Sequence, residues 1–267
     1  MEAIYKTGYA LSGGFIKGFA HLGATQALYE NDIRPEIISG VSAGALAGVF
    51  LADGKEPREI LELFNNKEFG SFTSFAIRAR GGFMLLDQFH DFLLENLSVN
   101  NIEKLKIPMI ITATDLDKGI AVHFRDGEIA PRVAASCCMP GLFTPICIED
   151  TRYIDGGVFM NLPVIPIREL CHQVVAINVS PIVAPEYKLN VVSVLQRTYH
   201  FMSHSNILVD REIADLLIEP ENLYGYSNRQ LDKANEIFES GYKAALKVLS
   251  GKHKETLNGT PLQTENN

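Results

Sequence analysis

Ile38-Ser39-Gly40-Val41-Ser42-Ala43-Gly44-Ala45 is the stretch around which the rest of this chain is arranged. An apolar run that begins at Ile37 leads into it as a strand does, and small residues continue from it with helical spacing. In a G-x-S-x-G elbow the chain turns so tightly that side chains two residues before and after the serine would clash. Glycine is therefore required at Gly40 and Gly44. The pattern predicts strand, sharp turn and helix, with the Ser42 hydroxyl exposed on the turn.

The elbow also places Ser42 at the N-terminus of the predicted helix. Free N–H groups and the positive end of the helix dipole stabilise an oxyanion at such a position. Because Gly-x-Ser-x-Gly is short and also occurs by chance in ordinary turns, the pattern alone leaves a catalytic serine and a plain turn open. The strand and helix periods on either side favour the catalytic interpretation.

Length and composition indicate the size of the fold. The chain has 267 residues, of which 46% are hydrophobic, and this is enough for a single well-filled core. No internal repeat or domain linker divides it. We predict one α/β domain over residues 1–250, with helices on both faces of a mainly parallel central sheet. The polar residues 251–267 are predicted to be a disordered tail.

Charge and segment composition exclude several classes of protein. The formal net charge of −8 argues against a nucleic-acid partner, which requires clustered Lys and Arg. The first residues lack the basic and apolar regions of a signal peptide, and no apolar run approaches the ~18 residues of a membrane span. We therefore expect a cytoplasmic protein that is at most peripheral to a membrane. The cysteines show no paired C-x-x-C spacing, so neither a zinc site nor a disulfide framework is predicted.

A second glycine-rich loop precedes the elbow by one strand–helix–strand step. The strand-like run Thr7–Leu11 leads into Ser12-Gly13-Gly14-Phe15-Ile16-Lys17-Gly18, and a helical stretch follows. The spacing fits neither a phosphate-binding P-loop nor a G-x-G-x-x-G dinucleotide motif. Both loops would lie at the carboxyl ends of neighbouring parallel strands, where open α/β sheets bind ligands. We therefore favour an oxyanion hole of Gly13 and Gly14 amides over a plain turn.

Apolar periodicity predicts the remaining elements. Helices are expected at 57–65, 87–97, 131–138, 189–215 and about 229–249, and strands at 107–114, 120–124 and 173–179. The stretch Phe69–Leu86 mixes aromatic, glycine and basic residues without a clean period. Two interpretations of it stay open: a mobile lid that touches a lipid surface, with Arg78 and Arg80 near phosphate, or an ordinary covering segment.

A carboxylate ends the strand-like run before Gly156 and Gly157. Because nothing projects from two glycines, Asp155 can approach the backbone of another loop closely. The alternative is a Gly-Gly turn started by aspartate, which is common. Taken singly, this stretch favours the plain turn.

The residue that would activate Ser42 is a separate question. An α/β-hydrolase would supply serine, then aspartate, then histidine, and His172, His200 or His204 could take the last role. That fold, however, carries its nucleophile after several strands, whereas only one strand–helix–strand step precedes Ser42. His200 and His204 are also spaced as two metal ligands on one helix face, but no third ligand is evident, so no metal site is predicted.

Four blocks of the sequence occur in the order seen in patatin-like phospholipases. They are Leu11–Gly23, Gly40–Gly44, Ala135–Gly141 and Asp155–Gly157. The chain resembles this family from about residue 7 to about residue 180. The resemblance implies a three-layer α/β/α patatin-like fold and a lipid acyl hydrolase with a Ser-Asp dyad.

The resemblance also implies roles for individual residues. Ser42 would be the nucleophile and Asp155 its base. The oxyanion hole would consist of backbone amides, those of Gly13, Gly14, Phe15 and Ala43. The family often has a third consecutive glycine where this chain has Phe15, which leaves open how the loop turns.

The expected function is hydrolysis of fatty-acyl esters through an acyl-serine intermediate, of the phospholipase A, lysophospholipase or carboxylesterase type. Two alternatives stay open: transfer of the acyl group to an alcohol, and lipid binding without turnover. The presence of both Ser42 and Asp155 favours an enzyme. The expected partner is a lipid or acyl-ester substrate, with transient contact with a membrane surface, no nucleic acid and no cofactor. Head-group preference and oligomeric state are not predicted.

Overall fold

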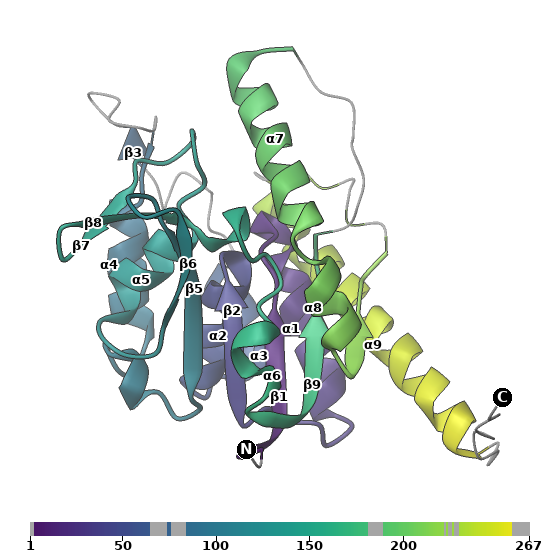
Figure 1. Cartoon of the computed structure of the whole chain (residues 1–267). Coiled ribbons are helices and arrows are strands. Elements are labelled where there is room, and N and C mark those ends of the chain that lie inside the picture. The colour runs from purple at the N-terminus through teal and green to yellow at the C-terminus, as the bar shows by residue number, and fades with distance from the viewer. Residues whose placement is uncertain are drawn as a thin grey trace, which may run out of the picture.

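The computed structural model describes residues 3–64, 74–75, 84–180, 189–221, 223, 226 and 230–257. Figure 1 shows helices on both faces of a central sheet in this part of the chain. The sheet has eight strands: β1 (Tyr5–Leu11), β2 (Ile37–Val41), β5 (Met109–Asp115), β6 (Ile120–Phe124), β7 (Ile146–Ile148), β8 (Thr151–Asp155), β9 (Cys171–Ile177) and β10 (Leu216–Ile218). Two short strands, β3 (Ser74–Phe75) and β4 (Met84–Leu85), pair antiparallel with each other.

Most of the helices are short, and the two longest are α7 and α9. The α-helices are α1 (Phe19–Tyr29), α2 (Ala43–Ala52), α3 (Pro57–Phe64), α4 (Asp87–Asn96), α5 (Ile129–Ser136), α6 (Ile165–Arg168), α7 (Val191–Ser205), α8 (Leu208–Ile213) and α9 (Ala234–Leu257). Single 3-10 turns are η1 (Phe15–Gly18), η3 (Ile102–Lys104), η4 (Gly156–Val158) and η6 (Leu231–Lys233).

The sheet is mixed, with the parallel strands grouped together. The strand order is β10-β9-β1-β2-β5-β8-β7, with β6 also paired to β5. The strands β10, β9, β1, β2 and β5 run parallel, and β6, β7 and β8 form the antiparallel pairs. The predicted three-layer α/β/α architecture with a mainly parallel sheet is confirmed.

Side chains alternate between two cores, as expected for strands buried on both faces. On β1, Tyr9 and Leu11 enter the larger core, which helices α1 to α5 and α9 cover. Ala10 points the other way, into a smaller core with Ile167 of α6 and Ile207 beside α8. The two cores explain why these strands read as continuous apolar runs.

Most predicted elements are present, with ends that differ by a few residues. The helical stretch predicted at 189–215 is two helices, α7 and α8, and the short strands β7 and β10 were not predicted. The last helix continues to Leu257, past the expected end at Leu249. The assignment of a tail after residue 250 stays a prediction. Most of Phe69–Leu86 lies outside the described residues, so neither interpretation of it is tested. Within the described ranges, no helix is long and apolar enough to cross a membrane.

Candidate active site

Ser42 occupies the turn between β2 and α2 in a backbone conformation that few residues adopt. Its φ and ψ are 52° and −122°, a strained region that costs about 1–3 kcal/mol and persists only where the surroundings enforce it. The enforcing contacts come from the flanking glycines. A Cβ on Gly40 would lie 2.5 Å from the carbonyl oxygen of Gly44, and one on Gly44 would lie 2.2 Å from the carbonyl oxygen of Leu11. A strand, a sharp turn at Ser42 and a helix follow one another here, in the order that the pattern predicts.

The register of the sheet brings Asp155 beside Ser42. β2 pairs with β5 only as far as Val41 and Thr112, and β8 pairs with the next residues of β5, beginning with Asp155 opposite Ala113. β6 pairs with residues of β5 in both of these stretches. Since a strand has two edges, β8 must occupy the edge that β2 leaves. Asp155 therefore stands where β2 would continue if the chain did not turn at Ser42.

The glycine after Asp155 allows this close approach. A Cβ on Gly156 would lie 2.5 Å from the carbonyl oxygen of Thr112 and 2.8 Å from Val41 Cγ2. The carboxylate is oriented by the amide of Gly157, which donates a hydrogen bond of 2.8 Å to Asp155 Oδ1. The sequence left a plain Gly-Gly turn open at this position, whereas in the structure the glycines bring two distant loops together.

The electrostatic environment of Asp155 raises its basicity. The side chain is 1% exposed, and burial raises the pKa of the Asp155 carboxyl to about 6. Hydrogen bonding from the Gly157 amide and from the hydroxyls of Ser42 and Tyr199 opposes this rise in pKa. A carboxylate with a pKa of about 6 is ionised at neutral pH and is a better proton acceptor than an ordinary aspartate.

The glycine-rich loop that follows β1 lies against the Ser42 side chain. Gly13 is so close that a Cβ there would lie 3.3 Å from Ser42 Cβ. The Gly13 amide already donates to the carbonyl oxygen of Asn161 at 3.1 Å, so the prediction that it is free to bind an oxyanion is wrong for this conformation. The amides of Gly14, Phe15 and Ala43 donate to no residue that the structure describes. Three of the four predicted donors therefore remain available.

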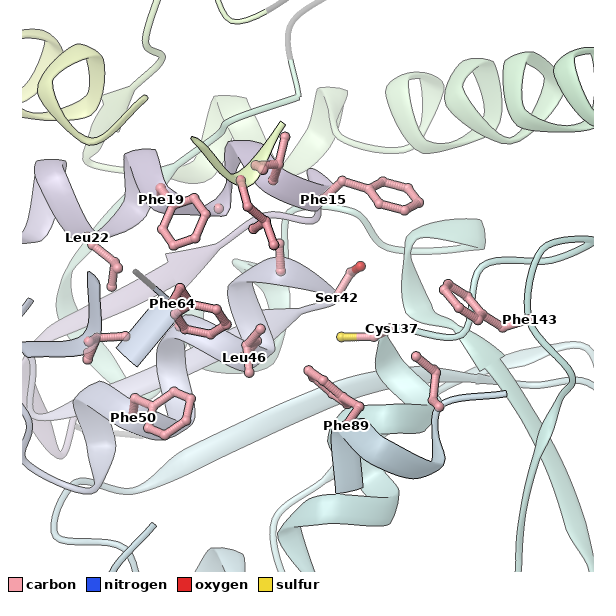
Figure 2. Close-up of a pocket in the computed structure, with 17 residues that line it drawn as sticks. Phe15, Phe19, Leu22, Ser42, Leu46, Phe50, Phe64, Phe89, Cys137 and Phe143 are labelled. Atoms are coloured by element: carbon pink, nitrogen blue, oxygen red, sulfur yellow. The ribbon is translucent and has the colours of Figure 1, made fainter. Parts of the chain in front are cut away.

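An apolar cavity opens beside Ser42 (Figure 2). Its volume is about 150 Å³, and apart from Ser42 and Cys137 its wall consists of apolar and glycine residues. In Figure 2, Phe50 and Phe64 lie to one side of Ser42 and Phe143 to the other. Six phenylalanines line the cavity: Phe15, Phe19, Phe50, Phe64, Phe89 and Phe143. Such a wall suits a hydrocarbon chain and offers little to a polar ligand.

Comparison with known proteins agrees with this geometry. Residues 9–167 match the model of a family described as patatin-like phospholipase. This range includes both the glycine-rich loop and Asp155. The chain belongs to the patatin-like phospholipase family.

Individual relatives show the extent of the likeness. An uncharacterized NTE family protein of Mycobacterium bovis is 31% identical over 160 residues, which are 59% of this chain and 44% of that protein. Lysophospholipase nte1 of Aspergillus fumigatus is 27% identical over an alignment that covers 97% of this chain and 19% of that protein. The chain thus spans less than half the length of these curated relatives. VipD of Legionella pneumophila shares the fold, with a TM-score of 0.54 at 16% identity, over 93% of this chain and 67% of VipD.

Phe15 is the departure from the patatin-like pattern noted in the sequence. It adopts a φ of 53°, in the left-handed region that glycine enters without strain. The loop therefore turns as a glycine-rich loop does, although a bulky residue stands there. Because Phe15 also lines the cavity, its side chain forms part of the wall next to the three available amides.

Ser136 links the elbow to β5 through two hydrogen bonds, a role that the sequence did not reveal. The Ser42 amide donates to Ser136 Oγ at 2.8 Å, and Ser136 Oγ donates to the carbonyl oxygen of Thr112 at 2.6 Å. Ser136 is fully buried, at the end of α5. It lies within the Ala135–Gly141 block that resembles patatin-like proteins, so the block was a signal, but it did not indicate a role for this residue.

Helix α7 and the residue after it contribute two polar side chains to the site that were not predicted. The phenol of Tyr199 is a hydrogen-bond donor to Asp155. The Asn206 side chain, just after α7, donates to the carbonyl oxygens of Gly157 and Val158 and accepts from the amide of Asn161. These contacts fix the Asp155–Gly157 turn against α7. No spacing in the sequence links residue 199 to residue 155.

The histidines do not form the triad considered as an alternative. The hydrogen-bond partners of the Ser42 hydroxyl are Asp155 and the Cys137 thiol. His172 lies on β9 between residues that pair with Tyr5 and Thr7, at the end of the sheet away from Ser42. His200 and His204 lie on α7, where Tyr199 makes the contact with Asp155.

His21 has a structural position instead. It is fully buried, its Nε2–H donates to the carbonyl oxygen of Ser12 at 2.8 Å, and burial lowers its pKa to about 4. It therefore stays neutral and holds the start of the glycine-rich loop. All four cysteines are free thiols. In the described part of the chain, no cluster of three metal-ligating side chains occurs.

Proposed function

We propose that this chain is a serine-dependent lipid acyl hydrolase, with Ser42 as nucleophile and Asp155 as general base. The observation that carries the proposal is the position of one hydroxyl. Ser42 lies at the start of α2, hydrogen-bonds to a buried carboxylate, and opens onto an apolar cavity. These are the three parts that cleavage of a fatty-acyl ester requires: a nucleophile with its base, a site for the oxyanion, and a place for the acyl chain.

Acylation follows from this arrangement. Ser42 Oγ attacks the ester carbonyl carbon while its proton passes to the Asp155 carboxylate. The carbonyl oxygen becomes an oxyanion, which accepts hydrogen bonds from the free amides of Gly14, Phe15 and Ala43 and faces the positive end of the α2 dipole. When the tetrahedral intermediate collapses, the bond to the alcohol oxygen breaks, and Asp155 returns the proton to the leaving alcohol. The product at this stage is acyl-Ser42.

Deacylation repeats the steps with water. Asp155 takes a proton from the attacking water, the same amides bind the second oxyanion, and the proton returns to Ser42 Oγ as the fatty acid leaves. The buried position of Asp155 favours both proton transfers because its raised pKa lies close to the working pH. The family and the name of the fungal relatives, lysophospholipase nte1, support phospholipid or lysophospholipid esters as the substrate class.

Active-site labelling tests the nucleophile. The purified chain is treated with a fluorophosphonate probe, and the labelled peptide is mapped by mass spectrometry. We expect the label on Ser42 and none in Ser42→Ala. Ser39→Ala is the matched control, because Ser39 is a buried hydroxyl three residues earlier that makes no hydrogen bond among the described residues, and it should keep the label. A label on any other residue contradicts the proposal.

Product analysis tests the reaction. Release of fatty acid is measured from lysophospholipid, phospholipid and triacylglycerol, with and without an alcohol acceptor. Free fatty acid as the main product supports hydrolysis, whereas an ester of the added alcohol indicates acyl transfer. Absence of turnover on every substrate, at every chain length, contradicts the proposal and favours lipid binding alone.

A further inference from the structure

Helices α7 and α8 present their apolar side chains to solvent. Along most amphipathic helices the apolar stripe faces the core. Here the exposed positions recur every three or four residues from the start of α7 into α8. The exposed fractions of the large apolar side chains lie between 38% and 73%, for Val191, Val194, Leu195, Phe201, Met202, Leu208 and Val209. No described residue covers this stripe, which we call the α7 stripe.

The α7 stripe stands at the rim of the candidate active site. In Figure 1, α7 rises from the end of the molecule opposite the N-terminus, which is the end toward which the parallel strands run. Leu195 Cδ1 lies 3.0 Å from the Cβ position of Gly141, two residues before the cavity-lining Phe143. From the inner side of the same helix, Tyr199 reaches Asp155. One helix therefore contacts the catalytic carboxylate with one face and presents apolar residues with the other.

The charge of α7 differs from that of the whole chain. The chain carries a net charge of −8, yet the sequence Val191–Ser205 contains no Asp or Glu and contains Arg197. The Arg197 guanidinium lies over the Phe201 ring at 5.1 Å. An exposed aromatic ring beside an arginine suits the boundary between acyl chains and phosphate head groups. Within α7 the local charge therefore complements an anionic lipid surface, whereas α8 adds Asp210, Arg211 and Glu212 to the lower end of the stripe.

We propose that the α7 stripe docks this protein on a lipid surface and places the mouth of the cavity against it. The inference rests on the proposed function, since an acyl chain that leaves a lipid aggregate must reach Ser42 across this rim. Docking through α7 keeps the desolvated path between lipid and cavity short. Because the same helix contacts Asp155 through Tyr199, the bound surface and the catalytic carboxylate are linked by one helix.

Vesicle binding of a paired set of variants tests the proposal. The test variant is Val194→Asn with Val209→Asn, and the control is Ile4→Asn with Leu94→Asn. The control removes apolar side chains that are at least as exposed, from the residue just before β1 and from α4, away from the stripe. Binding is measured by flotation with vesicles of equimolar phosphatidylcholine and phosphatidylglycerol. Loss of the lipid contacts of these two valines should weaken binding by about tenfold or more in the test variant, and the control should bind like the parent chain.

Ester cleavage and sedimentation are measured on the same three proteins to interpret the flotation result. Cleavage of p-nitrophenyl butyrate below its aggregation limit should be equal in all three proteins, which also reports that the variants fold. If the parent chain cleaves neither this ester nor any of the lipid substrates above, the proposed function fails, while the flotation result still decides docking. Docking is overturned if the parent chain does not bind vesicles, or if test and control bind equally. It is also overturned if sedimentation shows a dimer that only the test variant dissociates, since the stripe would then bind a second copy.

Discussion

The two sides of Ser42 differ in their chemistry: one side is apolar and the other is polar. On one side is the cavity, whose wall is apolar and comes mostly from residues 15–64 and 86–89. On the other side is the Asp155 carboxylate, held by polar groups from η4, α7 and the elbow itself. The cavity side depends on packing, which tolerates changes of shape and hydrophobic volume. The carboxylate side depends on single hydrogen bonds between buried groups, where one missing partner is costly.

This difference separates binding from chemistry. A change in the cavity should alter which acyl chains bind and leave the proton transfer intact. A change on the carboxylate side should alter the rate and its pH dependence and leave chain-length preference intact. Each of the following predictions is designed to separate the two sides or to show that they are coupled.

The largest effect is expected for Asp155→Asn. An amide cannot accept the Ser42 proton, so kcat should fall by about a thousandfold or more. The remaining activity should keep the chain-length preference of the parent chain, because the cavity is untouched. Ester hydrolysis with p-nitrophenyl substrates of increasing length measures both. If kcat stays within about tenfold of the parent value, Asp155 is not the base.

The same substitution should stabilise the fold at neutral pH. Because burial raises the pKa of Asp155 from its ordinary value of 3.8 to about 6, ionising it costs the folded state up to about 3 kcal/mol. The folded state therefore keeps its full stability below about pH 4, where the carboxyl is protonated. It loses this contribution from Asp155 as the pH rises through about 6. Urea unfolding at neutral pH should show Asp155→Asn as the more stable protein, and the gain should vanish near pH 4. An equal gain at both pH values would contradict the raised pKa.

The contrast between the two sides also explains what the sequence could predict. Strands, helices and the elbow follow from local periodicity and from glycine spacing, and these came out close to the structure. The elbow at Ser42, for example, is determined by the five residues Gly40–Gly44. By contrast, Asp155 meets Ser42 because β8 takes over the edge of β5 at Ala113, which is a matter of sheet register. Only the family resemblance pointed to it, and the stretch itself favoured an ordinary turn.

The missed residues lie on the carboxylate side for the same reason. Ser136, Tyr199 and Asn206 each bond to a group far away in the sequence, and such pairs leave no local pattern. The engaged amide of Gly13 is another case, since its partner Asn161 comes from a loop on a different strand connection. The exposure of the apolar face of α7 was not predicted either. Periodicity indicates that a helix has an apolar stripe, but not whether that stripe faces the core or the solvent.

A smaller effect, confined to the cavity side, is expected for Phe64→Ala. Phe64 lines the cavity and packs edge-on against Phe19 at 5.4 Å and Phe50 at 6.4 Å. A cavity of about 150 Å³ elsewhere holds a molecule the size of benzene, so the parent chain should favour acyl groups of about six to eight carbons. Removing the ring should raise the ratio of kcat/KM for longer over shorter acyl esters by about tenfold.

Phe92→Ala is the matched control for that change. Phe92 packs against the same rings, at 5.2 Å from Phe64 and 6.0 Å from Phe50, but it is not part of the cavity wall. Both variants should lose about 3–5 kcal/mol of stability, and only Phe64→Ala should change the chain-length ratio. If both shift the ratio equally, the loosened core and not the cavity wall determines the preference.

The smallest effect is expected for Tyr199→Phe, and it should appear only in the pH profile. Asp155 must be ionised to act as a base, so kcat/KM of the parent chain should rise through a pH of about 6 and level off above it. The Tyr199 phenol stabilises the ionised carboxylate and lowers its pKa. Without this donor the pKa of Asp155 is higher, and the acid limb should move to higher pH.

At high pH the Tyr199→Phe variant should approach the parent rate, because the carboxylate is then ionised in both proteins. Thr198→Val, at the exposed neighbouring position on α7, should leave the whole profile unchanged. A Tyr199→Phe variant that is equally slow at every pH would mean that the phenol only supports the packing of α7. A shifted limb would mean that α7, although it lies at the rim, belongs to the carboxylate side of Ser42, and that whatever binds α7 can change the basicity of Asp155.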